Sequence, residues 1–204
     1  MTAVTYARPL LIAATLCFLV ACSAKAPDTA AKKTGPPGLS GTLNPEAEKN
    51  YAEATTLWRR PVASASALEV CSDPAEAVRK LDRAIALEPE FARAYALRGL
   101  AESESGQKER GFEDLTAAVR LEPTAVHYAF RALVSMRLGQ EKAAERDLNY
   151  ALKLDAASDK AHNYLGVLNL SLGGRETACA HFRDGCTYGD CSFLEAARKE
   201  KICP

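Results

Sequence analysis

The chain has 204 residues, a length typical of one domain with extensions. Its 26 basic and 26 acidic residues cancel, and this balance argues against a protein whose main task is to bind nucleic acid. Hydrophobic residues at 48% and charged residues at 25% exclude an intrinsically disordered chain, and only three histidines are available for metal or acid–base sites.

The first element is a mainly apolar run of 11 residues from Leu10 to Val20. It is shorter than the roughly 20 residues that span a bilayer and has the length of a signal-peptide core. It ends in Leu19-Val20-Ala21-Cys22, which resembles the bacterial lipobox. The resemblance implies cleavage after Ala21 and lipid attachment at Cys22, although an ordinary secretory peptide with a chance cysteine is the alternative.

We therefore expect residues 1–21 to be a lipoprotein signal peptide and residues 22–44 to be the lipidated N-terminus with a flexible tether. The tether is rich in Ala, Pro, Gly, Lys, Ser and Thr and has no apolar period. By resemblance to enterobacterial lipoproteins, Ser23 rather than Asp after the cysteine favours outer-membrane sorting. The expected location is the cell envelope, anchored by lipid in the outer membrane and facing the periplasm.

Helices are predicted from residue 45 onward. Asn44-Pro45 and Asp73-Pro74 each place a capping side chain before a proline suited to the first helical position. We expect the first of these helices to end at Arg60-Pro61, and an insertion to separate it from the second.

A repeat then runs through the chain, with a period of about 34 residues. Leucines and alanines recur at that step in one set of helices (Leu81, Ala84, Leu87; Leu115, Ala118, Leu121; Leu148, Ala151, Leu154). Small residues recur in the alternate helices (Gly99, Ala132, Gly166), and glycines end them (Gly106, Gly139, Gly173). A helix pair that cannot bury its apolar face alone buries it by stacking on the next pair.

This pattern resembles the tetratricopeptide repeat (TPR). The resemblance implies an all-α fold of helix–turn–helix repeats stacked as a short right-handed solenoid with a C-terminal capping helix. The predicted units are 45–91 (N-terminal helices, a degenerate first repeat), 92–125 and 126–158 (two TPRs), and 159–204 (a degenerate TPR with a Cys-rich capping helix). Arg98 and Arg131 depart from the family pattern, which has Leu before the small residue.

Four cysteines lie in the last unit: Cys179, Cys186, Cys191 and Cys203. An exported chain favours disulfides. If the last two helices are antiparallel, nesting predicts Cys186–Cys191 and Cys179–Cys203, although four cysteines allow three connectivities. A zinc site is the disfavoured alternative because no CxxC pair is present, and Cys71 is left over.

No catalytic motif is found, and we predict a protein that is not an enzyme and that carries no cofactor and no metal. GxSxG, HExxH, Walker A and GxGxxG are absent. His181 lies near Cys179 and Asp184, an arrangement that could suggest a cysteine nucleophile with a histidine base. Cys179 and His181 are two residues apart on a helix and point about 200° away from each other, so we interpret His181 as a core or surface histidine.

The leading interpretation is a membrane-anchored scaffold that binds a protein or peptide and assists an envelope complex. The family resemblance implies a concave groove lined by the first helix of each pair. The candidate groove residues are Arg93, Leu100, Glu104, Leu133, Met136, Arg137, Lys160, Asn163 and Val167. Arg93, Arg137 and Lys160 suit an acidic segment or a C-terminal carboxylate. The alternatives are a pilotin-like assembly factor for an outer-membrane or pilus component and, further behind, a cysteine-based redox protein.

Overall fold

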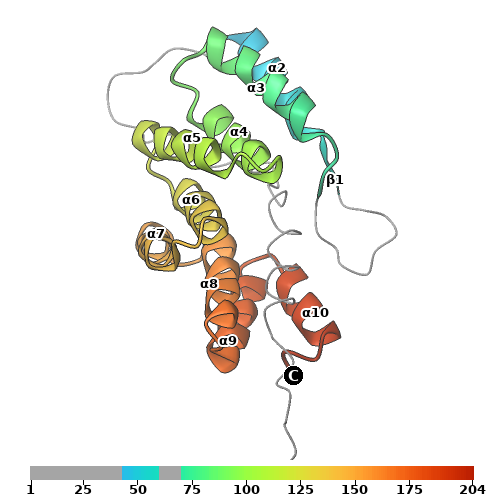
Figure 1. The fold of residues 1–204 in the computed structure, drawn as a ribbon, viewed down its shortest axis with the longest axis vertical. Helices are drawn as coiled ribbons and strands as arrows, with labels where there is room; N and C mark the ends of the chain where they lie inside the picture. Colours follow the sequence, from blue (N-terminus) through green and yellow to red (C-terminus); the bar gives the residue numbers. More distant parts are fainter. Residues whose placement is uncertain (1–42, 60–69) are drawn as a thin grey trace, which may run out of the picture.

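The computed structural model describes residues 43–59 and 70–204. Within them the chain forms a stack of helices with one short pair of strands (Figure 1). The helices are α2 (Pro45–Thr55), α3 (Pro74–Leu87), α4 (Ala92–Glu104), α5 (Lys108–Leu121), α6 (Ala125–Arg137), α7 (Glu141–Leu154), α8 (Asp159–Ser171), α9 (Arg175–Thr187) and α10 (Ser192–Lys199). The strands are β1 (Trp58–Arg59) and β2 (Val70–Cys71).

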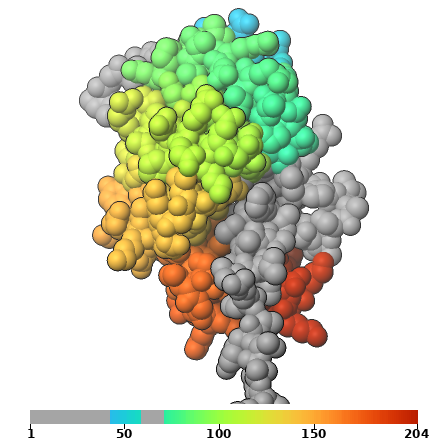
Figure 2. All heavy atoms as spheres, in the orientation of Figure 1, coloured from blue at the N-terminus to red at the C-terminus, as the bar shows by residue number. Residues whose placement is uncertain are grey.

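Consecutive helices pack as pairs: α2 with α3, α4 with α5, α6 with α7, and α8 with α9. Each pair also contacts the next, and the first helices of neighbouring pairs touch directly, α4 with α6 and α6 with α8. Figure 2 shows the same progression, with α2 and α3 at one end of the stack and the orange and red C-terminal helices at the other. The all-α repeat predicted from the sequence period is confirmed.

The helix ends follow the predicted local chemistry. The Asn44 side chain accepts hydrogen bonds from the backbone N–H groups of Glu46 and Ala47 at the start of α2, and Asp73 caps α3 through the N–H of Glu76. The glycines predicted to end α4, α6 and α8 all have positive φ (+90° at Gly106, +71° at Gly139 and +83° at Gly173), so each forms a left-handed cap.

The first pair differs from the prediction at one point. Helix α2 ends at Thr55, and the chain then enters β1, so Arg60-Pro61 does not end the helix. β1 pairs antiparallel with β2, with Trp58 opposite Cys71. Both residues are buried and belong to one hydrophobic core with residues of α2, α3 and α4. The degenerate first repeat therefore keeps its helix pairing.

The two helices of a pair approach closely at the small residues that recur in the alternate helices. A Cβ on Gly99 of α4 would lie 2.6 Å from the carbonyl oxygen of Gly111 on α5. A Cβ on Gly166 of α8 would lie 2.4 Å from the ring of Phe182 on α9. The side chains that fill the space beside these contacts, Leu115 and Phe182, are fully buried.

The two arginines that depart from the family pattern make equivalent ion pairs, which we call the Tyr–Arg–Asp sets. Arg98 lies over the Tyr95 ring at 5.4 Å and donates two hydrogen bonds to Asp114, at 2.6 and 2.8 Å. The second set, one repeat later, has Arg131 at 5.3 Å from the Tyr128 ring, with hydrogen bonds of 2.7 and 2.8 Å to Asp147. In both, a two-point guanidinium–carboxylate contact ties the first helix of a pair to the second.

Helix α10 covers the exposed end of the last pair. Its Phe193, Leu194 and Ala197 are buried. The Phe193 ring lies 6.0 Å from Phe182 of α9 and 6.2 Å from Tyr164 of α8, within the range of aromatic contact. The predicted capping helix is therefore present.

Candidate functional site

The first helices α4, α6 and α8 lie next to one another along the stack, since α4 contacts α6 and α6 contacts α8. We call the predicted groove residues on these helices the first-helix row. They separate into two groups. Leu100, Leu133, Asn163 and Val167 are at most 2% exposed, whereas Arg93, Glu104, Met136, Arg137 and Lys160 are half-buried.

The prediction needs correction at the four buried positions. Leu100, Leu133 and Val167 belong to one hydrophobic core, because the first helices are close enough to bury the side chains between them. Asn163 packs against Gly185 of α9 and donates a hydrogen bond from Nδ2 to the Asp190 carbonyl at 3.1 Å. These four residues hold the repeats together and do not present a surface to a partner.

Arg93 remains accessible and is held by weak contacts. Its guanidinium lies 3.4 Å from Glu48 of α2 and 5.4 and 5.3 Å from the rings of Tyr51 and Phe91. Burial raises the pKa of Tyr51, partly offset by the positive charge of Arg93. Because the Glu48 side chain is 54% exposed, this ion pair contributes little and can exchange with another carboxylate.

Arg137 and Lys160 lie farther along the row. Arg137 donates a hydrogen bond from Nη1 to the hydroxyl of Ser103 on α4 at 2.8 Å, and its carbonyl accepts one from Lys108 at 3.1 Å. Lys160 forms a long ion pair of 3.8 Å with its neighbour Asp159. The row therefore carries three cationic groups, one on each first helix.

A buried carboxyl group in α4 was not identified from the sequence. Glu102 is 2% exposed, and within the described residues its Oε2 has no hydrogen-bond partner. Its Oε1 lies 3.2 Å from the guanidinium of Arg110 on α5. Burial, reinforced by the negative charge of Asp114, raises the pKa of Glu102 to about 7. It follows the small residue Gly99 by three positions, where the TPR signature has its second aromatic residue, and that register is the sequence signal for its burial.

The C-terminal cysteines pair as nesting predicts. Cys179 of α9 is joined to Cys203, and Cys186 is joined to Cys191 across the turn that leads to α10. Cys71 is a free, buried thiol in the first core, distant in sequence from both disulfides. The disulfides therefore tie the capping segment to the last helix pair.

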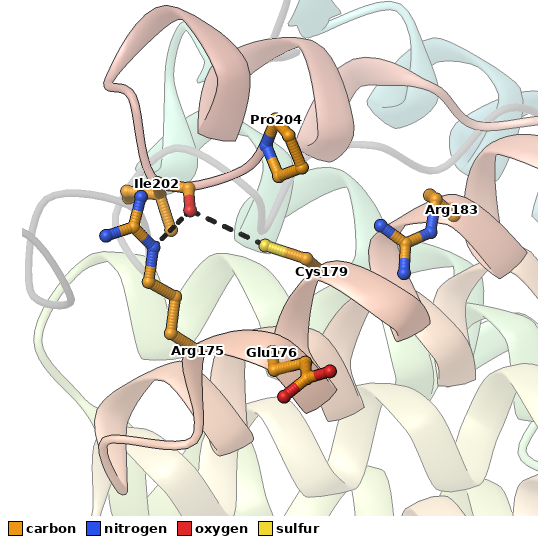
Figure 3. A pocket seen from close by; sticks show the side chains of 6 residues that line it. All are labelled: Arg175, Glu176, Cys179, Arg183, Ile202 and Pro204. Carbon is orange, nitrogen blue, oxygen red and sulfur yellow. Dashed lines mark hydrogen bonds between the residues drawn. The ribbon is translucent and has the colours of Figure 1, made fainter.

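Beside the Cys179–Cys203 bridge lies an open pocket of about 410 Å³ (Figure 3). Arg175 donates hydrogen bonds to the carbonyl oxygens of Ile202 and Lys201, and the Ile202 carbonyl also lies 3.6 Å from the Cys179 sulfur. These contacts use Arg175 to hold the chain end. Glu176 and Arg183 remain as the charged side chains of the pocket lining.

The predicted lipidation site, Cys22, lies outside the described residues, as do the expected signal peptide and most of the tether. Among the helices of residues 43–59 and 70–204, none is long and apolar enough to cross a membrane.

Comparisons with known proteins bear on the fold. No family model and no curated protein matches the sequence. Among solved structures, TTC0263, a thermophilic TPR protein from Thermus thermophilus, matches with a TM-score of 0.55 and 23% identity over 63% of this chain and 72% of its own. MamA (41-end) from Desulfovibrio magneticus RS-1 matches with a TM-score of 0.53 and 16% identity over 79% of this chain and 89% of its own.

The APC/C hetero-tetramer Cut9–Hcn1 also matches, with a TM-score of 0.55 and 22% identity over 63% of this chain. This chain spans only 27% of the length of that protein. At identities this low the matches bear on the fold alone. They agree with the sequence period, the glycine caps and the helix pairing described above. The chain has the fold of a tetratricopeptide-repeat solenoid.

Proposed function

We propose that this protein is a lipid-anchored interaction module that binds an acidic segment or C-terminal carboxylate of a protein partner. The observation that carries the proposal is the stack of helix pairs in which the first-helix row includes one half-buried cation from each of three helices: Arg93 on α4, Arg137 on α6 and Lys160 on α8. Arg93 and Lys160 lie in the first turn of α4 and α8, and Arg137 lies in the last turn of α6.

The present contacts of these cations support exchange with a ligand. Arg93 and Lys160 take part in ion pairs of 3.4 and 3.8 Å, and the partner carboxylates are 54% and 31% exposed. The Arg93–Glu48 pair is exposed on both sides and contributes about 0–1 kcal/mol, whereas the Lys160 side chain is 12% exposed. A ligand carboxylate that replaces Glu48 gains charge-assisted hydrogen bonds to Arg93 at little cost. Met136, half-buried in the same row, offers an adaptable apolar contact beside the charges.

Membrane attachment is part of the same proposal and rests on the sequence. The Leu19-Val20-Ala21-Cys22 motif supports acylation of Cys22, and several acyl chains on one residue give stable anchoring. The segment after Cys22 then acts as a tether between the anchor and the helical stack. Two disulfides at the C-terminal end agree with an oxidising compartment such as the periplasm.

The test is site-specific photo-crosslinking in the producing cell. A photoreactive residue at Met136, on the first-helix row, is compared with one at Lys153, exposed on the second helix α7. We expect a discrete protein adduct from position 136 and none from position 153. Arg137→Glu should abolish the adduct, because it reverses the charge that attracts an acidic ligand. Equal adducts from both positions, or adducts insensitive to Arg137→Glu, would contradict the proposal.

Intact mass of the protein extracted from membranes tests the anchor. We expect a chain that begins at Cys22 and carries acyl groups, and an unacylated full-length chain would refute the membrane part. A pilotin-like role is distinguished by the adduct itself: its partner would be an outer-membrane or pilus subunit whose level falls when this protein is removed. No specific observation favours the redox alternative, since four of the five cysteines in the described residues are paired.

A further inference from the structure

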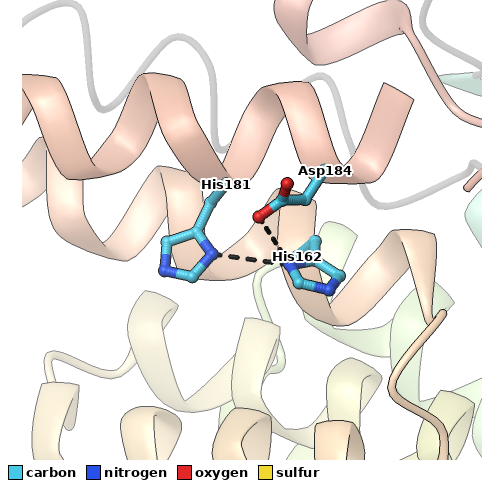
Figure 4. A group of neighbouring side chains, drawn as sticks. All are labelled: His162, His181 and Asp184. Carbon is cyan, nitrogen blue, oxygen red and sulfur yellow. Dashed lines mark hydrogen bonds and ion pairs between the residues drawn. The ribbon is translucent and has the colours of Figure 1, made fainter. Parts of the chain in front are cut away.

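Two histidines and an aspartate from the last helix pair converge at the surface (Figure 4). His162 lies on α8, and His181 and Asp184 lie one turn apart on α9. His162 Nδ1 is 3.5 Å from His181 Nδ1 and 3.7 Å from an Asp184 carboxylate oxygen. One ligand atom from each of the three residues lies within 4.8 Å of the other two. The histidines are half-buried and Asp184 is exposed, so solvent reaches the cluster.

The hydrogen bonding of His162 turns a lone pair toward the cluster. Its Nε2 lies 3.2 Å from the carbonyl oxygen of Ala156, an acceptor only, so Nε2 carries the proton in the neutral ring. Nδ1 is then unprotonated and faces His181 and Asp184. Metal-bound histidines have this arrangement, in which one nitrogen binds the ion and the other donates to a backbone carbonyl.

The repeat register shows what the cluster replaces. His162, Leu165 and His181 stand one repeat after the three members of the second Tyr–Arg–Asp set. Asp184 likewise stands one repeat after Tyr150, whose ring contacts Tyr128 at 4.6 Å, so the same two helix faces meet at this place. In the earlier repeats an arginine cation sits between the aromatic ring and the carboxylate. In the last repeat Leu165 stands in the position of that arginine. The imidazole nitrogens of His162 and His181 and the carboxylate of Asp184 converge where the guanidinium lies in the earlier repeats.

We propose that His162, His181 and Asp184 bind a divalent transition-metal ion, with zinc as the reference ion and water as the fourth ligand. Tetrahedral zinc with bonds of about 2.0–2.1 Å separates its ligand atoms by about 3.3–3.4 Å. The two separations of 3.5 and 3.7 Å are within a few tenths of an ångström of that requirement. Imidazole and carboxylate together suit zinc, nickel or copper, whereas magnesium and calcium prefer oxygen ligands alone. The ion would clamp α8 to α9, in place of the guanidinium that joins the earlier pairs.

The test is a zinc titration by calorimetry of the tag-free chain from residue 22 to residue 204, with its two disulfides formed. Cys22 and Cys71 are replaced by serine so that free thiols add no binding. We expect one zinc ion per chain, with affinity at least about tenfold weaker in His162→Ala and in His181→Ala. The matched control is Glu176→Gln, which removes an exposed carboxylate from the same helix, α9, and should leave the affinity unchanged. Magnesium should give no saturable binding.

A second measurement separates a metal site from a structural role of the histidines. In nitrogen-detected NMR of the imidazole rings, zinc should shift Nδ1 of His162 and His181, while Nε2 of His162 keeps its proton. Zinc should also raise the melting temperature of the chain, and His162→Ala should lose that increase while it keeps the helical circular dichroism spectrum. Absence of saturable zinc binding, equal affinity in the histidine variants, or zinc on Nε2 of His162 would overturn the proposal.

Discussion

Replacing Glu102 with glutamine should change how the stability of this protein depends on pH. The native carboxyl group is 2% exposed, and its pKa is raised to about 7 from the ordinary value of 4.5. The folded chain therefore holds a proton that the unfolded chain releases between these two values. Glutamine keeps the shape of the side chain and cannot titrate, so the comparison isolates this one proton.

The sign and size follow from linkage. Where the folded state binds more protons than the unfolded state, the free energy of unfolding falls as pH rises. The fall begins near pH 4.5 and is complete above about pH 7. One pKa unit corresponds to about 1.36 kcal/mol, so the full difference is about 3 kcal/mol. Since a part of the fall lies below pH 5, we expect about 1–3 kcal/mol across the range from pH 5 to pH 8.

The assay is urea unfolding of wild type and Glu102→Gln at a series of pH values from 5 to 8. The informative quantity is the difference between the two unfolding free energies at each pH. His127 and His181 also have lowered pKa values, and they destabilise the fold as pH falls, but they are common to both chains and cancel. Relative to the variant, wild type should lose about 1–3 kcal/mol between pH 5 and pH 8. A difference that stays constant across this pH range would refute the assignment of a raised pKa to Glu102.

Three further predictions concern helix packing, a disulfide and an ion pair, and each is measured as the free energy of unfolding in urea. Gly111→Ala places a Cβ 2.4 Å from the Gly99 carbonyl oxygen, so it should destabilise by about 1–3 kcal/mol despite the better helix propensity of alanine, and a neutral result would contradict the close contact. Cys203→Ala opens the bridge to Cys179, whose sequence separation is 24, and should cost about 3 kcal/mol relative to the oxidised wild type; equal stability would argue against the bridge. Arg131→Lys keeps the charge but cannot make the two-point contact with its carboxylate, so a loss of about 1–2 kcal/mol is expected, and no loss would show that the second hydrogen bond contributes nothing.

The repeat architecture could be predicted because its determinants are local or periodic. Asn44 and Asp73 cap helices through their own first turns, and Gly106 supplies a backbone conformation that other residues rarely adopt. In a repeat fold each helix packs on its neighbours in the sequence, so the sequence period alone predicts which helices lie side by side. The disulfide pairing was predicted only on the assumption that the last two helices are antiparallel, because four cysteines otherwise allow three connectivities.

Accessibility in the first-helix row could not be predicted in the same way. A helical position shows which face a side chain occupies, but burial depends on how near the neighbouring helix lies. Leu100 and Val167 are buried because α4, α6 and α8 contact one another. The short ladder between Trp58 and Cys71 was also missed, because two-residue strands carry no periodic signal.

The histidine cluster shows how a repeat alignment can locate chemistry that motif searches do not. His162 and His181 are separated by 19 residues, and no standard metal-binding spacing joins them. Their relation becomes visible when each is placed on the residue that it replaces, because Tyr128 and Asp147 already face one another through Arg131. A solenoid preserves the contact geometry from pair to pair while the side chains change. In the two earlier repeats an arginine cation joins the two helices of a pair at this position. In the last repeat the arginine is replaced by Leu165, and the proposed metal cation bound by His162, His181 and Asp184 would join the helices instead.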